Sequence, residues 1–362
     1  MSDPALAAIL EASANVDNTY PDFEILESYY TSGNGRDEIR LHVLMPKSLL
    51  DGHQQQVIPL MVRIHGGYLI TGSGLYRAWF SDWTLEYAKQ AGAVIVSPNY
   101  RLMPESNGTE ILEDMDSFWR WLRQGGVDTL LAKNGFECLQ IDHDQTLVLG
   151  ESAGGYLAMQ LALSYPDDIQ ALIAVYPLLD LQSEFYTRAY SKPISGVQNR
   201  PLSVIEDHLD SIRSTPRDRL RPVTEADPPD RLELSFAVVQ HGRFLEFLGQ
   251  DNPRLFPIKR ITDDIDADAA GKGERLPPMF IFHGKDDSAV PYQGTIRFIE
   301  TLTKTRPLAK YRLESLPGDH GFDIGTSIGS WRWLQDGLQF IALAWLKKMR
   351  MRQGLVEPQT KI

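Results

Sequence analysis

Short runs of apolar, β-favouring residues recur along the chain from position 59 onward and alternate with stretches of helical periodicity. Five runs are apolar almost without a break, as is typical of strands buried on both faces of a parallel sheet: 59–64, 93–97, 146–149, 171–175 and 279–282. Residues 311–316 predict a last strand, and the alternating segments around 24–30 and 38–45 predict an antiparallel edge hairpin. The pattern therefore predicts an α/β fold with a mostly parallel central sheet flanked by helices.

Helical stretches between these strands have apolar residues three and four positions apart. One stretch contains Trp79, Trp83 and Tyr87, and the next contains Ile111, Met115 and Phe118. Such stripes indicate helices that pack on a sheet. The first 15 residues predict a short amphipathic helix, because they lack the basic segment and apolar run of a secretion signal.

Residues 182–276 interrupt this alternation with many Pro, Asp and Arg residues. Helical periodicity returns only near 202–212 and 232–248. A connection of this length between strands is expected to hold its own structure or to serve a function. We therefore expect an inserted cap or lid over 182–276 and a core formed by 1–181 and 277–362, with the N-terminal segment able to join the cap.

The composition is that of an ordinary globular protein, with 43% hydrophobic and 23% charged residues. A formal charge of -12 with dispersed Lys and Arg argues against a nucleic-acid partner. No apolar stretch approaches the roughly 20 residues of a membrane span. The single cysteine, Cys138, excludes an intramolecular disulfide and fits a reducing compartment, so we expect a cytoplasmic protein and leave a homodimer open.

The strongest chemical signal is Gly150-Glu151-Ser152-Ala153-Gly154, which follows an expected strand and begins an expected helix. A nucleophilic serine needs its hydroxyl held out on a tight strand-to-helix turn, and small residues two before and two after allow that turn. The helix N-terminus also favours developing negative charge. A strand ending in an ordinary glycine turn is the alternative, and the strand-turn-helix context makes it the weaker one. Ser152 is therefore the predicted nucleophile.

A second element, His65-Gly66-Gly67-Tyr68, follows the expected strand 59–64. Ester hydrolysis passes through a tetrahedral oxyanion, which preorganised N–H groups must stabilise. The backbone N–H groups of Gly67, Tyr68 and Ala153 are the predicted oxyanion-hole donors, with Gly66 enabling the turn. For His65 we favour a local hydrogen bond that holds the loop over a role as base.

A nucleophilic serine needs a base and an acid that orients it, and both follow later strands. Asp286 and Asp287 lie after the strand 279–282, and His320 lies in a glycine-rich loop after the strand 311–316. The order Ser, Asp, His is the one used by folds of this kind. Motif spacing favours Asp287 as the acid, with Asp286 as the alternative, and His320 as the base that takes the Ser152 proton.

The sequence gives no support for metal binding or nucleotide binding. The remaining histidines are scattered and form neither an H-E-x-x-H motif nor a cluster with the single cysteine. Gly72-Ser73-Gly74 lacks the third glycine of a dinucleotide-binding fingerprint, and no G-x-x-x-x-G-K-[ST] occurs. We expect no metal and no cofactor.

These motifs together resemble the hormone-sensitive-lipase-like branch of the α/β-hydrolases. The resemblance is carried by 65–67, 150–155, the Tyr-Arg-Leu-Met-Pro-Glu block at 100–105 and the approach at 141–144, and it covers roughly 40–346 apart from the cap. It implies carboxylesterase activity under a mobile cap, with Arg101 and Glu105 as supporting residues. Two features depart from the family: Tyr68 replaces the usual third glycine, and the cap aligns with nothing in it.

The sequence therefore predicts a serine esterase that acts on a small-molecule carboxylic ester through an acyl-enzyme. An amidase is the nearest alternative, because the same three residues serve both reactions. A biosynthetic enzyme of secondary metabolism that performs acyl transfer, cyclisation or carbon–carbon cleavage is another. A ligand-binding receptor on this fold is disfavoured, because such receptors typically lack the histidine that is present here at His320.

Overall fold

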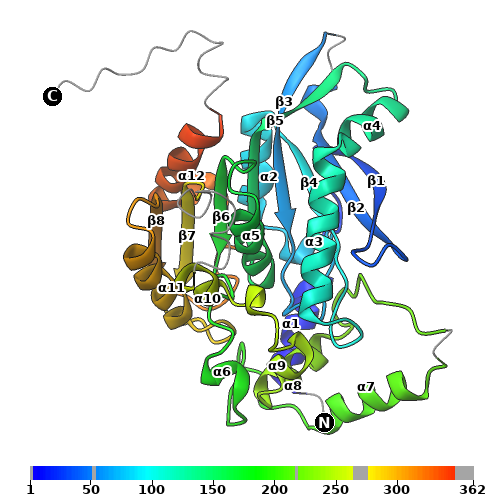
Figure 1. The fold of residues 1–362 in the computed structure, drawn as a ribbon, viewed down its shortest axis with the longest axis vertical. Helices are drawn as coiled ribbons and strands as arrows, with labels where there is room; N and C mark the ends of the chain where they lie inside the picture. The colour runs from blue at the N-terminus through cyan, green and yellow to red at the C-terminus, as the bar shows by residue number, and fades with distance from the viewer. Residues whose placement is uncertain (1–2, 51–53, 217–218, 264–275, 347–362) are drawn as a thin grey trace.

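The computed structural model describes residues 3–50, 54–216, 219–263 and 276–346. Eight strands form one sheet in the order β1-β2-β4-β3-β5-β6-β7-β8 (Figure 1). β1 and β2 form an antiparallel hairpin at one edge, β2 pairs with β4 antiparallel, and the remaining pairs are parallel. The predicted fold class and edge hairpin are thereby confirmed. The strands are β1 (Phe23–Thr31), β2 (Glu38–Pro46), β3 (Gln56–Ile64), β4 (Val94–Pro98), β5 (Leu139–Glu151), β6 (Ala171–Val175), β7 (Met279–Gly284) and β8 (Tyr311–Leu316).

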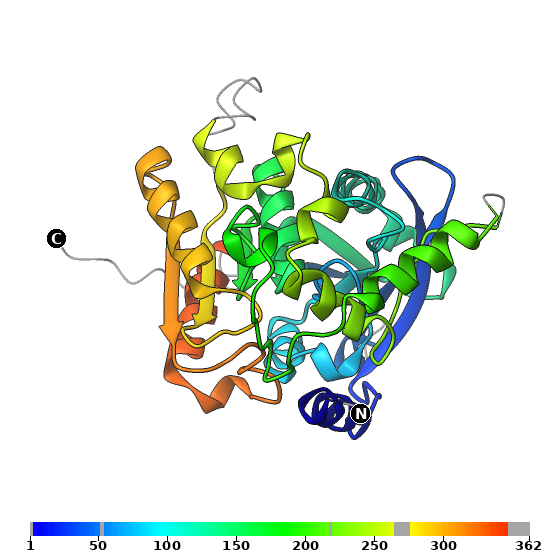
Figure 2. The same cartoon turned by 90° about the horizontal axis from the view of Figure 1, so that it is seen from below.

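Helices bury both faces of the sheet, which explains why the central strands are apolar at successive positions. Along β3, Leu60 and Val62 join the core on one face, whereas Met61 joins the core on the other. The first face is covered by α3 (Gly108–Arg123), α4 (Gly126–Lys133), α5 (Ala153–Ser164), α10 (Pro257–Thr262) and α11 (Tyr292–Thr305). The second is covered by α2 (Asp82–Ala91) and α12 (Arg332–Trp345), so the molecule has three layers (Figure 2).

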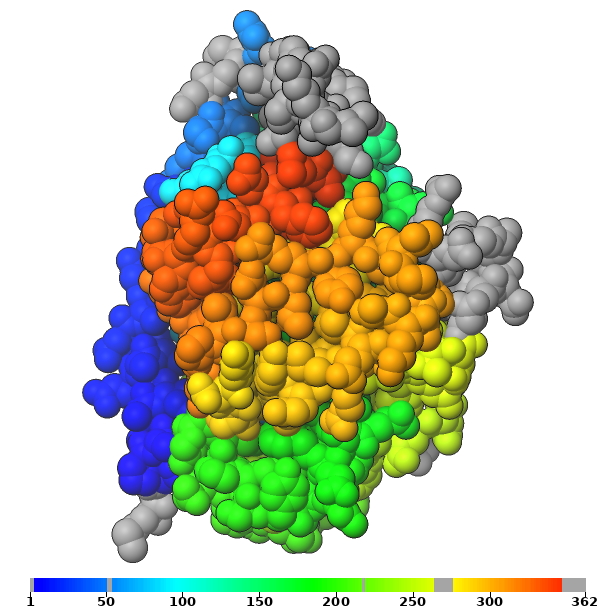
Figure 3. All heavy atoms as spheres, turned by 90° about the vertical axis from the view of Figure 1, so that its left-hand side faces the viewer, coloured from blue at the N-terminus to red at the C-terminus, as the bar shows by residue number. Residues whose placement is uncertain are grey.

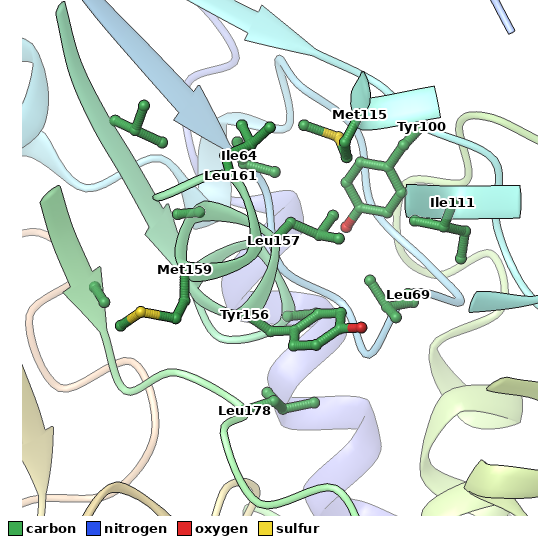
Figure 4. Packing of buried hydrophobic residues seen from close by; sticks show 14 of the residues in the cluster. Ile64, Leu69, Tyr100, Ile111, Met115, Tyr156, Leu157, Met159, Leu161 and Leu178 are labelled. Carbon is green, nitrogen blue, oxygen red and sulfur yellow. The ribbon is translucent and has the colours of Figure 1, made fainter. Parts of the chain in front are cut away.

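Helix α5 packs tightly against the end of β3. Figure 4 shows Tyr156 and Leu157 of α5 among Ile64, Leu69 and Tyr100, all of which are buried. A Cβ at position 154 would lie only 2.0 Å from the Ile64 carbonyl oxygen, so this approach requires glycine. The packing fixes where the N-terminus of α5 stands relative to the carboxyl ends of the strands.

The chain between β6 and β7 leaves the sheet and forms several short helices: α6 (Glu184–Thr187), α7 (Ser203–Ser214), α8 (Leu232–Gln240), α9 (Phe244–Leu248) and α10, with the 3-10 turn η3 (Pro253–Leu255). The prediction of a single helix near 232–248 is wrong. Gly242, with φ of +66°, separates α8 from α9 because left-handed backbone ends a helix. Residues 264–275 of the predicted cap lie outside the described residues.

Helix α1 (Pro4–Ala14) confirms the predicted N-terminal helix and lies beyond the carboxyl ends of the parallel strands, at the same end of the molecule as α8 (Figure 1). Asp3 caps α1 by accepting from Ala5 and Leu6 N–H, and it also accepts from the Gln198 N–H at 3.0 Å. This ties the start of the chain to the segment after α6, which covers the same end of the sheet in Figure 3. Short 3-10 turns complete the fold: η1 (Lys47–Leu49), η2 (Arg77–Trp79) and η5 (Ile328–Ser330).

The Tyr-Arg-Leu-Met-Pro-Glu block lies in the loop after β4 and contacts both α3 and the segment between β6 and β7. The Arg101 Nε lies 2.7 Å from the buried Asp114 carboxylate of α3. Glu105 pairs with Arg231, just before α8, and lies 3.1 Å from His208 of α7. Both residues thus make supporting contacts of the kind that the family resemblance implied.

Candidate active site

Ser152 stands between β5 and α5, at the sharp turn that the Gly-Glu-Ser-Ala-Gly motif makes. Its backbone has φ of 59° and ψ of -119°, a conformation that L-residues rarely adopt, and its N–H donates to the Val175 carbonyl oxygen at 2.9 Å. A Cβ at position 150 would come within 2.1 Å of the Gly154 carbonyl oxygen, so glycine is required there. The surrounding backbone therefore holds Ser152 in the geometry expected of a nucleophilic serine.

The loop after β3 lies directly against Ser152. A Cβ at position 66 would be 3.1 Å from the Ser152 Cβ, and one at position 67 would be 1.9 Å from the Thr71 carbonyl oxygen. Gly67 has φ of +103° and Tyr68 has φ of +55°. In the part of the chain that the structure describes, the N–H groups of Gly67, Tyr68 and Ala153 make no hydrogen bond. These donors are free to stabilise a negative charge beside Ser152.

His65 lies behind this loop. Its ring stacks on Tyr100 at 4.4 Å, and its Nδ1 is 2.8 Å from the Gly66 carbonyl oxygen. Burial disfavours the charged imidazole and lowers the pKa of His65 to about 3. A buried, neutral histidine that bonds its own loop fits the local role expected from the sequence.

Asp287 and His320 come from the loops after β7 and β8 and meet at the same edge of the sheet. Nδ1 of His320 lies 2.8 Å from Oδ2 of Asp287. The other carboxylate oxygen accepts from the N–H groups of Ala289 and Val290 at 2.9 and 2.7 Å. The alternative acid, Asp286, is exposed and accepts from the Gly318 N–H at 3.1 Å. The geometry thus favours Asp287 over Asp286 as the partner of the histidine.

Asp287 and His320 shift each other's pKa. Burial alone would raise the pKa of Asp287, but His320 and His283 outweigh it and hold the pKa well below its usual range. Burial would lower the pKa of His320, but the Asp287 charge and hydrogen bond, helped by Asp319 and Asp323, raise it above 6.5. The result is a carboxylate that stays ionised and an imidazole that is more basic than usual.

Three residues that the sequence analysis did not single out support this pair. The Tyr176 ring packs 4.4 Å from the His320 ring, and its hydroxyl donates to Asp323 at 2.9 Å. His283, the penultimate residue of β7, places its Nε2 3.2 Å from Asp287 Oδ2. Tyr176 directly follows β6, so its place at the carboxyl end of a strand was the available signal.

A cavity of about 480 Å³ lies above these groups. Its walls include the predicted nucleophile Ser152, the base His320 and the oxyanion-loop residues Gly66, Gly67 and Tyr68. Ile9, Ala12 and Ser13 of α1 and Leu232 and Phe236 of α8 line it as well. Among the described residues no hydrogen bond joins the Ser152 hydroxyl to His320, and such bonds often tighten only when substrate binds.

Glu151 lies next to the nucleophile in the wall of the cavity. Its Oε1 is 3.2 Å from Nε of the buried Arg63, whereas its buried Oε2 has no hydrogen-bond partner in the described structure. Burial raises the pKa of Glu151 to about 7, against the opposing effect of Arg63. The remaining Arg63 nitrogens donate to the carbonyl oxygens of Gly74 and Trp79, so this arginine is fully engaged behind the wall.

The described residues hold no group of three or more His, Cys, Asp or Glu side chains able to bind a metal ion. They also hold no helix with the length and apolar character needed to cross a membrane.

Comparisons with known proteins place this chain in a family. Residues 61–226 match a family model described as the alpha/beta hydrolase fold. A protein of Phoma sp. named as a probable carboxylesterase is 30% identical over 304 residues, which cover 84% of this chain and 91% of that protein. The chain belongs to the α/β-hydrolase family. The predicted membership is thereby confirmed.

Other proteins that resemble this chain are more distant. The crystal structure of a fungal esterase from Rhizomucor miehei is 16% identical, covers 95% of this chain and 98% of its own, and superposes with a TM-score of 0.56, which supports the fold. A non-reducing polyketide synthase of Preussia isomera is 26% identical over 321 residues, which cover 78% of this chain but only 13% of the synthase.

Proposed function

We propose that this α/β-hydrolase cleaves carboxylic esters with Ser152 as nucleophile, His320 as general base and Asp287 as the acid that orients it. With Nδ1 of His320 donating to Asp287, Nε2 is the atom left to accept the Ser152 proton. The serine oxygen then attacks the ester carbonyl, and the same proton passes to the leaving alcohol as the carbon–oxygen bond breaks. Water activated by His320 next releases the acid from the acyl-enzyme.

The oxyanion of each tetrahedral intermediate would be stabilised by the N–H groups of Gly67, Tyr68 and Ala153. These N–H groups make no hydrogen bond in the described structure, and Gly67 and Tyr68 line the same cavity as Ser152. They require no reorganisation when charge develops, which is the feature that makes such groups effective.

The segment 182–276 and α1 would act as a cap over this site. Residues of α1 and α8 line the cavity on the side away from the sheet. Such a cover excludes water and strengthens every electrostatic interaction inside.

The observation that carries this proposal is the 2.8 Å contact between His320 and Asp287 at the edge of a cavity that Ser152 also lines. The test is incubation with a fluorophosphonate probe, followed by intact mass and peptide mapping, beside a panel of p-nitrophenyl esters of increasing acyl length. We expect one probe per chain, on Ser152, and turnover of at least the short esters. Absence of labelling by the folded protein would contradict the proposal.

Acyl transfer to an acceptor other than water is a second candidate function. Its support is the similarity of most of this chain to a segment of a polyketide synthase. It predicts labelling of Ser152 with slow hydrolysis of simple esters, and faster release of the acyl group when an alcohol or amine acceptor is added.

The activity should depend on the ionisation of His320. Since only neutral imidazole can accept the serine proton, and since Asp287 raises the pKa of His320, kcat/KM should fall as pH drops through a value above 6.5. The measurement is kcat/KM for a neutral ester across the pH range, with circular dichroism at each pH to verify folding. A profile that stays flat down to about pH 4.5 would argue against a histidine base.

A further inference from the structure

The polar groups that line the cavity include acids but, within the described residues, neither lysine nor arginine. Asp319 and Glu151 both lie in the wall, and Arg63 behind it is engaged with Glu151 and with carbonyl oxygens. A carboxylate or phosphate on a bound ligand would therefore meet the Asp319 carboxylate, and no lysine or arginine side chain in the described wall could pair with it. Such an arrangement repels anions at close range.

The hydroxyl groups of the wall are mostly committed as donors. A hydroxyl has one hydrogen, and four of these hydrogens already point to protein acceptors. Tyr68 donates to Ala289 O at 2.5 Å, Tyr176 to Asp323 at 2.9 Å, Thr71 to Ala226 O at 2.7 Å and Ser235 to Leu232 O at 2.7 Å. These four hydroxyl groups can therefore only accept hydrogen bonds from a ligand. Above its pKa of about 7, Glu151 is ionised, and its buried Oε2, which has no partner in the described structure, adds another acceptor.

Asp319 marks the side of the cavity on which the alcohol part of the ester would lie. His320 must pass its proton to the leaving oxygen, so the alcohol group lies next to His320. Asp319 precedes it in the chain, and its carboxylate accepts from the His320 N–H and from Ser288 N–H and Oγ–H. These bonds hold the acid in place while it remains exposed to the cavity.

On the basis of the proposed ester hydrolysis, we infer that the substrate is an uncharged ester with a largely apolar body whose alcohol part carries a hydrogen-bond donor such as a hydroxyl. The apolar body matches the wall, whose apolar lining residues include Ile9, Leu232, Phe236 and Trp79. The donor matches the acceptors, because a buried acceptor is stabilised only by a ligand that brings a hydrogen. An anionic ester is excluded by the same groups.

Three acetate esters test this inference: 4-(hydroxymethyl)phenyl, 4-(methoxymethyl)phenyl and 4-(carboxymethyl)phenyl acetate. The methylene group separates each substituent from the reacting oxygen, so the leaving groups stay similar in reactivity. At about pH 8, we expect kcat/KM to be roughly three-fold higher for the hydroxymethyl than for the methoxymethyl ester, and about ten-fold lower for the carboxylate than for the methoxymethyl ester. A carboxylate ester hydrolysed as fast as the others would overturn the exclusion of anions, and equal rates for the two neutral esters would overturn the need for a donor.

Two variants that each remove one negative charge test whether Asp319 causes the discrimination against anionic esters. Asp319→Asn removes one negative charge, while its amide oxygen can still accept from Ser288 and His320. We expect this variant to reduce the ratio of kcat/KM between the methoxymethyl ester and the carboxylate ester about three-fold. Glu184→Gln removes one negative charge from an exposed side chain of α6 that does not line the cavity. We expect the ratio of kcat/KM between the two esters to stay at the wild-type value. Equal narrowing by both variants would overturn the assignment to Asp319.

Binding to the Ser152→Ala variant separates this inference from the proposed reaction. Calorimetric titration with the three esters should give the same order of affinity without any turnover. If no ester is hydrolysed by the wild type but this order is found, the proposed function fails and the inference on ligand class stands. If the order is absent or reversed, the inference fails whatever the rate of hydrolysis.

Discussion

Replacement of Ser152 by alanine should lower kcat for any ester about 10⁵- to 10⁶-fold, the loss typical when a nucleophilic serine is removed. The hydroxyl is the only group on the turn after β5 that can form an acyl-enzyme, and the free N–H donors around it cannot replace a nucleophile. The variant should also lose all labelling by a fluorophosphonate. Steady-state rates with a p-nitrophenyl ester and intact mass after labelling measure both effects.

Ser235→Ala is the matched control for this prediction. Ser235 lines the same cavity, but it lies on α8 and its hydroxyl donates within its own helix to Leu232. We expect kcat to change by no more than a few-fold, as for loss of one ordinary hydrogen bond. Residual labelling of Ser152→Ala at the wild-type rate would mean that another residue is the nucleophile.

The sheet could be predicted closely because its strands are buried on both faces. A strand such as β6 is a continuous apolar run between Gln170 and Tyr176-Pro177, and the predicted range 171–175 matches the observed one. β5 is the instructive exception, because it begins at Leu139, seven residues before the apolar run at 146–149. The extension is a partly exposed segment paired with β3, and pairing of this kind leaves no apolar run in the sequence.

The helices of the segment between β6 and β7 could not be predicted in the same way, because they are short and depend on tertiary contacts. The periodicity of 232–248 continues across Gly242, and the observed break there depends on the left-handed conformation of one glycine. The contribution of α1 to the cavity also depends on a distant contact, that between Asp3 and the Gln198 N–H. Sequence periodicity carries no information about such a partner.

The sequence motifs predicted the candidate catalytic residues, but not the residues that pack against and support them. Glycine spacing around Ser152 and after β3 follows from local sterics, which a motif records directly. Tyr176 and Asp323 are far apart in sequence and form no motif, yet they brace one face of His320. Contacts of this kind come only from the packing of separate loops at the edge of the sheet.

Replacement of Asp287 by asparagine should lower kcat about 10³- to 10⁴-fold, whereas Asp286→Asn should lower it by no more than a few-fold. An amide at 287 cannot stabilise the imidazolium that forms when His320 takes the serine proton, and its NH₂ group can bond the wrong imidazole tautomer. At 286 an amide oxygen can still accept from the Gly318 N–H, so that loop is retained. Kinetics of the two variants, which have the same net charge, measure the difference.

The pH profile of Asp287→Asn distinguishes loss of this charge from a general distortion of the site. Asp287 is the main group that raises the pKa of His320, against a burial effect that lowers it. Without the carboxylate, burial dominates and the pKa of His320 should fall. The acid limb of kcat/KM should therefore move to lower pH in Asp287→Asn, while that of Asp286→Asn should stay near the wild-type position. If instead Asp286→Asn shows both the large loss and the shifted limb, the acid is Asp286, and the 2.8 Å contact between Asp287 and His320 is structural.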